Sequence, residues 1–357
     1  MRNITKRPTG IAAVMVVAAL IAALGVGCSG GDDTSEPTQQ VLVVEPTASP
    51  ARSVAASAPI RTASSTPTPE PTPEPTPSPE PKLVSLDWLA ADVALPPFEP
   101  IAAQHTDAGL DAAITAALAD FHGESSVVVR DLKNGISASI NASRTWYAAS
   151  TFKAAILLTA YQQRDAGTLD FESIVTLKPE YAEDDLGTLD YLGIRPNDTI
   201  TVGDAIKGMI VVSDTPLAVM LEDVVGGNAV DAALRNIGAT TMSVNSHDLP
   251  TTAADLAALL VAIDSGQEVS SESRAEMLSL MSQEWYRSGI AAGLPDGTQY
   301  AHKSGTLGAA THDAAIVWGP NGPYVIVVMT DGSGGWDPIA AVSSAVWAYF
   351  NGATAGN

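Results

Sequence analysis

The chain has 357 residues, of which 18 are basic and 40 acidic, so its formal net charge is −22. Such an excess of carboxylates argues against binding to nucleic acids, whose phosphates would repel it. With one cysteine, at position 28, the chain can form no internal disulfide, and any folded domain must rely on its hydrophobic core.

The first 27 residues are typical of a secretory signal, because three basic residues precede an apolar run over 11–26 that ends in "GVGC". A lone cysteine after such a run resembles a bacterial lipoprotein lipobox, which implies cleavage before Cys28 and a lipid on its sulfur. Gly25 departs from that motif, which usually has leucine there. The alternative is an uncleaved anchor, since the run is near the lower limit for a spanning helix. Either way we expect an exported protein tethered on the outer side of the cytoplasmic membrane.

Residues 28–82 are rich in Ser, Thr, Ala and Pro and end in "TPTPEPTPEPTPSPEPK". This composition cannot bury enough apolar surface to order itself, and its prolines favour extended polyproline II. We therefore expect a disordered stalk, followed by a connector over 83–103 and a folded domain over 104–352.

The predicted domain begins with a helix, since apolar residues recur at helical spacing over 110–121. Two β-prone runs, 125–132 and 136–143, then flank Asn134-Gly135, which is a strong hairpin signal. Further helices are expected in 148–163, 201–212, 228–239, 251–263 and 337–350, and further strands in 299–306, 313–319 and 324–332.

The order of these elements is helix, two strands, a block of helices, three strands and a helix. Strands from both ends of the domain around a helical middle imply an α+β fold. We expect one antiparallel sheet of about five strands with N- and C-terminal helices, and an all-helical lobe inserted between its halves. A functional site would lie in a cleft between the two parts.

A lysine lies within the apolar stretch "YAASTFKAAILLTAY". Lysine is seldom buried without a partner, because an unpaired ammonium in a dry site is costly. In a helix Ser150 would lie one turn before Lys153 and on the same face. This pairs a hydroxyl with an amine whose basicity the apolar surroundings can tune, although Ser-x-x-Lys alone is a weak signal.

Two further motifs follow. Ser213-Asp214-Thr215 lies between an apolar run and Pro216, where it could equally be an ordinary helix cap. Lys303-Ser304-Gly305-Thr306 lies on a β-prone run, where the lysine could equally be an exposed strand residue.

In this order the three motifs resemble S-x-x-K, S-D-N and K-T-G of the class A β-lactamases and penicillin-binding proteins. The resemblance covers about 104–352 and implies an acyl-enzyme on Ser150. It also implies Lys153 as the base and Ser213 as a proton relay to the leaving nitrogen. The oxyanion hole would use the N–H groups of Ser150 and Thr306.

The resemblance also implies a binding site for the substrate carboxylate. Lys303 would supply a positive charge and would lower the pKa of Lys153. Gly305 belongs to the same strand motif, and the hydroxyls of Ser304 and Thr306 would lie beside the carboxylate. His312 aligns with a second cation found in many class A enzymes, but it could equally be a histidine at the rim.

Two departures from the family pattern bear on turnover. Thr215 replaces an asparagine whose amide would contact Lys153 and the substrate's side-chain amide. Class A enzymes also use a loop glutamate to activate the deacylating water, and the matching stretch 238–251 is short and has none. His247 and Asp248 are its titratable residues, and a capping role for Asp248 before the next helix is the simpler interpretation.

No metal or cofactor is expected. The five histidines include no His-x-x-x-His pair, one cysteine cannot build a zinc site, and no phosphate-binding glycine loop is present.

We expect a monomeric serine hydrolase that opens β-lactams or related acyl-peptide bonds, with slow deacylation. A D-Ala-D-Ala carboxypeptidase or esterase on the same scaffold is one alternative. A penicillin-binding or cell-wall-sensing lipoprotein that does not turn over is the other.

Overall fold

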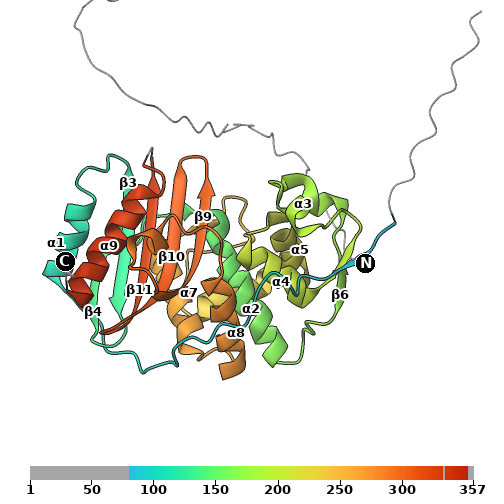
Figure 1. Ribbon diagram of the computed structural model, residues 1–357, viewed down its shortest axis with the longest axis horizontal. Helices are drawn as coiled ribbons and strands as arrows, with labels where there is room; N and C mark the ends of the chain where they lie inside the picture. The colour runs from blue at the N-terminus through green and yellow to red at the C-terminus, as the bar shows by residue number, and fades with distance from the viewer. Residues whose placement is uncertain (1–79, 333, 353–357) are drawn as a thin grey trace, which may run out of the picture. The chain divides into compact units, whose positions relative to one another are not determined.

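The computed structural model describes residues 80–332 and 334–352. The predicted signal, Cys28 and the predicted stalk as far as residue 79 lie outside these ranges. Within them, no helix has the length and apolar character needed to cross a membrane. The predicted order of elements is confirmed, and so is the α+β fold (Figure 1).

The main sheet has six strands in the order β2-β4-β3-β11-β10-β9. Five of them pair antiparallel as predicted, and the sixth, β2, is a two-residue edge strand that pairs parallel to β4. The strands are β2 (His105–Thr106), β3 (Glu124–Asp131), β4 (Ile136–Ile140), β9 (Gln299–Leu307), β10 (Ala310–Gly319) and β11 (Gly322–Asp331).

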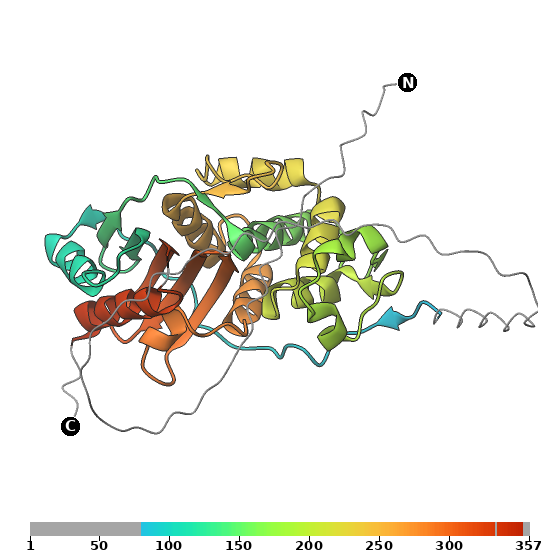
Figure 2. The same cartoon turned by 90° about the horizontal axis from the view of Figure 1, so that it is seen from above.

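Both faces of this sheet are covered, which the alternation of side chains along a strand makes possible. On β11, Ile326 and Val328 pack in the core beneath α1 (Ala108–Ala117) and α9 (Asp337–Asn351). Their neighbours Val325 and Val327 join the other core. That second face is covered by α7 (Ala253–Ser265), and α2 (Lys153–Asp165) contributes side chains to the same core. Figure 2 shows α1 and α9 side by side, in teal and red.

The inserted lobe contains α3 (Thr188–Leu192), α4 (Val202–Val211), α5 (Thr215–Val225) and α6 (Gly227–Asn236). It is not entirely helical, since it also carries a three-stranded sheet in the order β1-β7-β6 and the 3₁₀ helix η2. These elements are β1 (Leu83–Val84), β6 (Ile174–Thr176), β7 (Thr199–Thr201) and η2 (Pro179–Asp184).

The helix α2 runs between the sheet and this lobe (Figure 1). Its residues from Lys153 to Tyr161 are all buried. A helix that is apolar on every side requires neighbours all around it, and this explains why its sequence lacks an amphipathic pattern. The N-terminal end of α2 is therefore enclosed by both parts of the fold.

The remaining elements hold segments against these layers. The helix α8 (Ser271–Ser282), which the sequence pattern does not predict, packs on the edge strand β9. The short strands β5 (Trp146–Tyr147) and β8 (Pro250–Thr251) pair antiparallel just before the 3₁₀ helix η1 (Ala149–Phe152), and η3 (Ile290–Gly293) packs on α9.

The segment 83–103 is more than a connector. Besides the β1–β7 pairing, the Leu86 side chain is fully buried and its N–H donates to Asp204 Oδ2 at 3.0 Å. Farther on, the N–H of Val93 donates to Ser279 Oγ at 2.9 Å. The folded body therefore begins some 20 residues before the predicted boundary at residue 104.

Candidate active site

The chain enters α2 through a constrained turn. The N–H of Ala148 donates to the carbonyl of Leu249 at 2.8 Å, which continues the β5–β8 pairing. Ala149 then has φ of +46°, in the left-handed region that costs a non-glycine residue of the order of 1–3 kcal/mol. This turn places Ser150 in η1, directly before α2.

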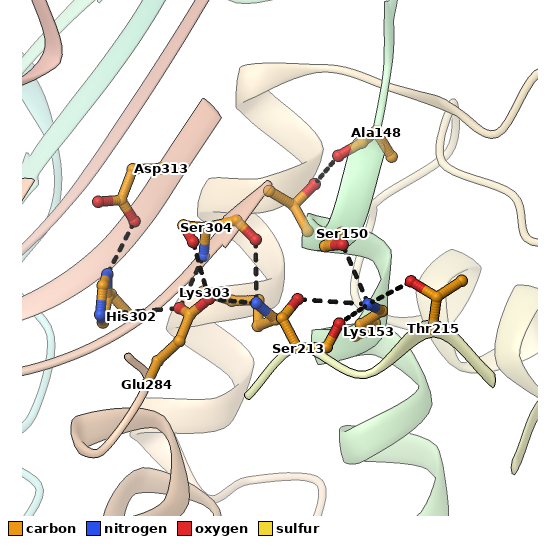
Figure 3. A network of polar contacts seen from close by, with 11 residues as sticks. Ala148, Ser150, Lys153, Ser213, Thr215, Glu284, His302, Lys303, Ser304 and Asp313 are labelled. Carbon is orange, nitrogen blue, oxygen red and sulfur yellow. Dashed lines mark hydrogen bonds and ion pairs between the residues drawn. The ribbon is translucent and has the colours of Figure 1, made fainter. Parts of the chain in front are cut away.

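Lys153 Nζ is surrounded by four oxygen atoms (Figure 3). It lies 3.0 Å from Ser150 Oγ and 3.2 Å from Thr215 Oγ1. From Ser213 it contacts both the carbonyl, at 2.5 Å, and Oγ, at 3.3 Å. The structure thus brings together the first two motifs, which are about 60 residues apart in sequence.

Burial, and after it the nearby ammonium of Lys303, lower the pKa of Lys153 to about 7, against the opposing effects of Asp214 and Glu284. About half of the molecules then carry a neutral amine at pH 7. A neutral amine has a lone pair and can accept the proton of the Ser150 hydroxyl, whereas an ammonium can only donate.

The second motif forms the loop between α4 and α5. Ser213 has φ of +59°, so its backbone is constrained as at Ala149. Asp214 caps α5 by accepting from the N–H of Leu217 at 2.7 Å, and it also accepts from Thr188 Oγ1 at 2.6 Å. Burial raises the pKa of Asp214, although both hydrogen bonds and the charge of Lys153 oppose this.

Thr215 contacts Lys153, although the sequence analysis expected this contact to be lost with the asparagine of the family pattern. Its hydroxyl lies in the Lys153 hydrogen-bond network, although a threonine offers no amide to a substrate. The departure from the family pattern therefore concerns the substrate side of the site rather than the lysine side.

The strand β9 passes directly beside Ser150. A Cβ atom added to Gly305 would lie 2.6 Å from the backbone N of Ser150 and 3.0 Å from that of Thr151. Only glycine permits this approach. Thr306 follows at the exposed end of the strand, where its hydroxyl donates to the carbonyl of Ala310 at 3.1 Å.

Lys303 and Ser304 are both buried and both bind Glu284, a residue that the sequence analysis did not identify. Lys303 Nζ forms an ion pair with Glu284 Oε1. Ser304 Oγ donates to the same oxygen at 2.7 Å, and the Ser304 N–H donates to Oε2 at 2.8 Å. The Ser304 hydroxyl, predicted to face a substrate carboxylate, is thus bonded to a protein carboxylate.

Behind Glu284 lies a second buried pair. His302 Nδ1 is 3.0 Å from Asp313 Oδ1, and His302 Nε2 is 3.7 Å from Glu284 Oε2. Burial disfavours the charged imidazole, but the two carboxylates outweigh it and raise the pKa of His302. No sequence pattern marks Glu284 or Asp313, because these residues come from separate elements and meet only when α8 packs against the sheet.

His312 is not placed as a second cation. Its side chain is fully buried, its ring packs edge-on against Trp146 at a centroid distance of 5.4 Å, and Nε2 lies 3.0 Å from the Tyr147 carbonyl. Burial lowers its pKa below the ordinary value, despite opposing contributions from the backbone at Thr311 and Tyr147. A neutral ring here supports the segment that leads into Ser150.

The stretch 238–251 contributes backbone rather than a catalytic carboxylate. His247 and Asp248 are exposed in a turn, and Asp248 is not the cap of the following helix. Thr252 has that role, because its hydroxyl accepts from the N–H of Asp255 at 3.0 Å. The nearest backbone link to the nucleophile is the Leu249 carbonyl described above. Among the described residues no group of three or more His, Cys, Asp and Glu side chains could hold a metal ion.

Comparison with known proteins agrees with this arrangement. The sequence profile of the β-lactamase enzyme family matches residues 109–350, which is more than half of the chain. Among proteins of curated function, none matches.

Among solved structures, PBP-A superposes with a TM-score of 0.66 at 25% identity, covering 70% of this chain and 98% of that one. A class A β-lactamase variant of the last common ancestor of Gram-negative bacteria gives 0.60 at 25% identity, covering 68% and 98%. The β-lactamase of Sphaerobacter thermophilus shares the fold, with a TM-score of 0.62 at 24% identity, covering 68% and 97%.

The ordered motifs, the fold and the profile match lead to one conclusion. This chain belongs to the β-lactamase enzyme family and is a β-lactamase-like serine hydrolase.

Proposed function

We propose that this protein attacks β-lactams, or related acyl-peptide bonds, through an acyl-enzyme on Ser150. The observation that carries the proposal is the 3.0 Å contact between Ser150 Oγ and a buried lysine whose pKa is about 7. A serine hydroxyl is a poor nucleophile until a neighbouring base takes its proton. Lys153 is the group that can do so at neutral pH.

Acylation would proceed in two proton transfers. Neutral Lys153 takes the Ser150 proton as Oγ attacks the carbonyl carbon, and the negative charge that develops on the carbonyl oxygen is met by backbone N–H groups of Ser150 and Thr306. The carbonyl carbon–nitrogen bond then breaks. Its nitrogen takes a proton from Ser213, which regains one from Lys153, within hydrogen-bond reach at 3.3 Å.

We infer that hydrolysis of the acyl-enzyme is slow. The segment 238–251 lacks a glutamate, its Asp248 is exposed, and the residue whose carbonyl bonds Ala148 is a leucine. A leucine-to-glutamate mutant of PBP-A has been solved as an acyl-enzyme complex with penicillin G, with a TM-score of 0.65 at 26% identity, covering 72% of this chain and 99% of that one. A protein of similar fold can thus carry an acyl group from penicillin G.

Two other outcomes use the same site. Lys153 could also deacylate small peptide or ester intermediates, which would make the protein a D-Ala-D-Ala carboxypeptidase or esterase. Without turnover, the protein would be a penicillin-binding or cell-wall-sensing lipoprotein. One scaffold can carry all three functions, so the kinetics of the site decide among them.

Intact-mass measurement of the full-length protein after brief exposure to benzylpenicillin tests the proposal. We expect one covalent adduct that persists for minutes or longer and is absent from Ser150→Ala. Labelling of Ser150→Ala at the wild-type rate would contradict the assigned nucleophile. Rapid multiple turnover without a detectable adduct would contradict slow deacylation, while leaving the hydrolase function intact.

We also propose that the protein is monomeric and works outside the cytoplasmic membrane, tethered through a lipid on Cys28. The support is the apolar run that ends at this cysteine, followed by a proline-rich stretch long enough to act as a stalk. Intact-mass measurement of the protein extracted from membranes of a cell with the lipidation machinery tests this: we expect a chain that begins at Cys28 and carries the added mass of a lipid. A chain that retains residues 1–27 without added lipid would favour an uncleaved anchor.

A further inference from the structure

Glu284 is a fully buried carboxylate that the acylation steps above do not use. It accepts three bonds from β9, namely the Lys303 ammonium, the Ser304 hydroxyl and the Ser304 N–H. Breaking a buried ion pair by removing one partner is strongly destabilising, so these bonds hold the carboxylate and β9 together. The strand that they hold is the one that passes Ser150 N.

Glu284 lies in a buried cluster of opposite charges. Its carboxylate and that of Asp313 face the Lys303 ammonium and the His302 imidazole, and the two carboxylates raise the pKa of His302 against the effect of burial. Nearby, the ring of Tyr300 packs on His302, and Arg287 lies close enough to influence Tyr300. Charge balance matters because Lys153 responds to this cluster: Lys303 disfavours its protonation and Glu284 favours it.

We propose that Glu284 is a positioning residue: it fixes Lys303 and Ser304 beside the nucleophile, and its charge, balanced by His302, sets the pH range in which Lys153 acts as the base. The inference rests on the proposed role of Lys153. The other charged group that faces Lys153 is Asp214, at the cap of α5, while Ser150, Ser213 and Thr215 are neutral.

The proposal predicts shifts of opposite sign. Glu284→Gln removes a negative charge, so Lys153 becomes harder to protonate and acylation should extend to lower pH. His302→Gln removes a positive charge, so Lys153 becomes easier to protonate and acylation should require higher pH. We expect each midpoint to move by roughly 0.5 to 1 pH unit, less than for a charge in direct contact.

A third variant separates charge from position. Glu284→Asp keeps the charge but is one methylene shorter, so it should lower the maximal acylation rate by about 10-fold while leaving the midpoint near that of the wild type. As a matched control, Asp264→Asn breaks another buried ion pair, with Arg274, whose guanidinium also donates to the backbone carbonyls of Asp264 and Pro96. This control should lower stability without moving the midpoint.

The experiment measures the acylation rate of the full-length protein by benzylpenicillin from pH 5 to 9, with intact-mass detection. In parallel, ¹³C-lysine NMR follows the protonation of Lys153 without substrate, which is practical because the chain has seven lysines. A wild-type protein that is never acylated would overturn the proposed function. The NMR titration would still test the effect of Glu284 on Lys153.

Opposite shifts in Glu284→Gln and His302→Gln would support the proposal. Unmoved midpoints in both variants, or shifts of the same sign, would overturn it and leave Glu284 a structural residue. If Glu284→Gln fails to fold, the His302→Gln titration decides alone: an unchanged midpoint there contradicts the balancing charge.

Discussion

At the scale of single residues, the burial of Lys153 links catalysis to pH. Its amine is the proposed base, and its pKa is about 7. Protonation removes the lone pair, so activity should fall as pH drops below this value and reach a plateau above it. The Ser150 hydroxyl does not ionise in this pH range. The decrease of the acylation rate at low pH should therefore follow the protonation of Lys153.

We therefore expect the rate of labelling by a fluorescent penicillin to rise about tenfold between pH 6 and the plateau, with a midpoint near 7. Lys153→Ala should slow labelling by at least about 100-fold, which is the lower range for a lost acid–base group. A pH-independent rate in the wild type would show that another group activates Ser150.

The same burial carries a cost in stability. The ordinary pKa of 10.5 falls to about 7 on folding, so the unfolded chain binds the proton more tightly. As far as Lys153 is concerned, the free energy of unfolding is therefore undiminished above pH 10.5 and decreases as the pH falls from 10.5 toward 7. At pH 7 this amounts to about 4 kcal/mol, at 1.36 kcal/mol per unit.

Lys153→Met should accordingly raise the free energy of unfolding at pH 7, by roughly 1 to 3 kcal/mol once its lost hydrogen bonds are subtracted. Lys207→Met is a matched control, because Lys207 is paired with Asp87 and Asp204 and its pKa is raised rather than lowered. Urea unfolding compares the two variants, and destabilisation by Lys153→Met would contradict the linkage.

Gly305 packs directly against the backbone of the nucleophile. A methyl group at this position would meet the backbone N–H groups of Ser150 and Thr151, neither of which can move freely. Gly305→Ala should therefore displace β9 from Ser150 and lower the acylation rate by about 100-fold or more, as expected for a lost oxyanion donor. The nearby Gly308 offers no matched control, because its φ of +62° would strain an alanine there whatever its neighbours. Thr306→Ser, which keeps the backbone, should retain near wild-type acylation.

At the scale of elements, the β5–β8 pairing brings the loop residue Leu249 beside the segment that leads into the nucleophile. It bonds the carbonyl of Leu249 to the N–H of Ala148, two residues before Ser150. The neighbouring Asp248 is exposed in its turn. A carboxylate introduced at position 249 would thus lie on the segment that bonds to the chain leading into Ser150, whereas Asp248 is exposed.

We expect Leu249→Glu to shorten the lifetime of the penicillin adduct by about 100-fold, because a positioned base typically contributes 10² to 10⁴ in rate. Asp248→Ala should leave the lifetime nearly unchanged. Both lifetimes can be read by intact mass after excess penicillin is removed. A long-lived adduct in Leu249→Glu would show that slow deacylation has a cause other than a missing base.

At the scale of the whole molecule, the lobe and the helix α8 are held together by segments that are distant in sequence. The segment 83–103 is one of them, because it adds β1 to the lobe and then continues past α8. Leu86 is its anchor, with no exposed surface, while Leu83 three residues earlier is 58% exposed.

Leu86→Ala should lower the free energy of unfolding by about 2 to 5 kcal/mol, the usual range for a buried leucine. Leu83→Ala should change it by less than about 0.5 kcal/mol. Chemical denaturation of the full-length variants checks both values. Equal changes in the free energy of unfolding for the two variants would show that this segment is a connector and not part of the folded body.

The order of elements, the sheet with its covering helices and the three motifs of the site can all be predicted from the sequence. These follow from local rules: periodicity indicates which face is buried, Asn-Gly indicates a turn, and Ser150 and Lys153 are three residues apart at the start of a helical segment. The pairing of strands β9, β10 and β11 was equally local, since short connections join them.

Which charged side chains face one another cannot be predicted from the sequence, because it depends on how the layers pack. His312 and Asp248 align with functional positions in sequence, yet one is buried against Trp146 and the other is exposed. Glu284 carries no local signal, and it became part of the site because α8 packs against β9. A side chain's charge state depends on burial and on partners brought from elsewhere in the chain, and these distances exist only after the layers have packed.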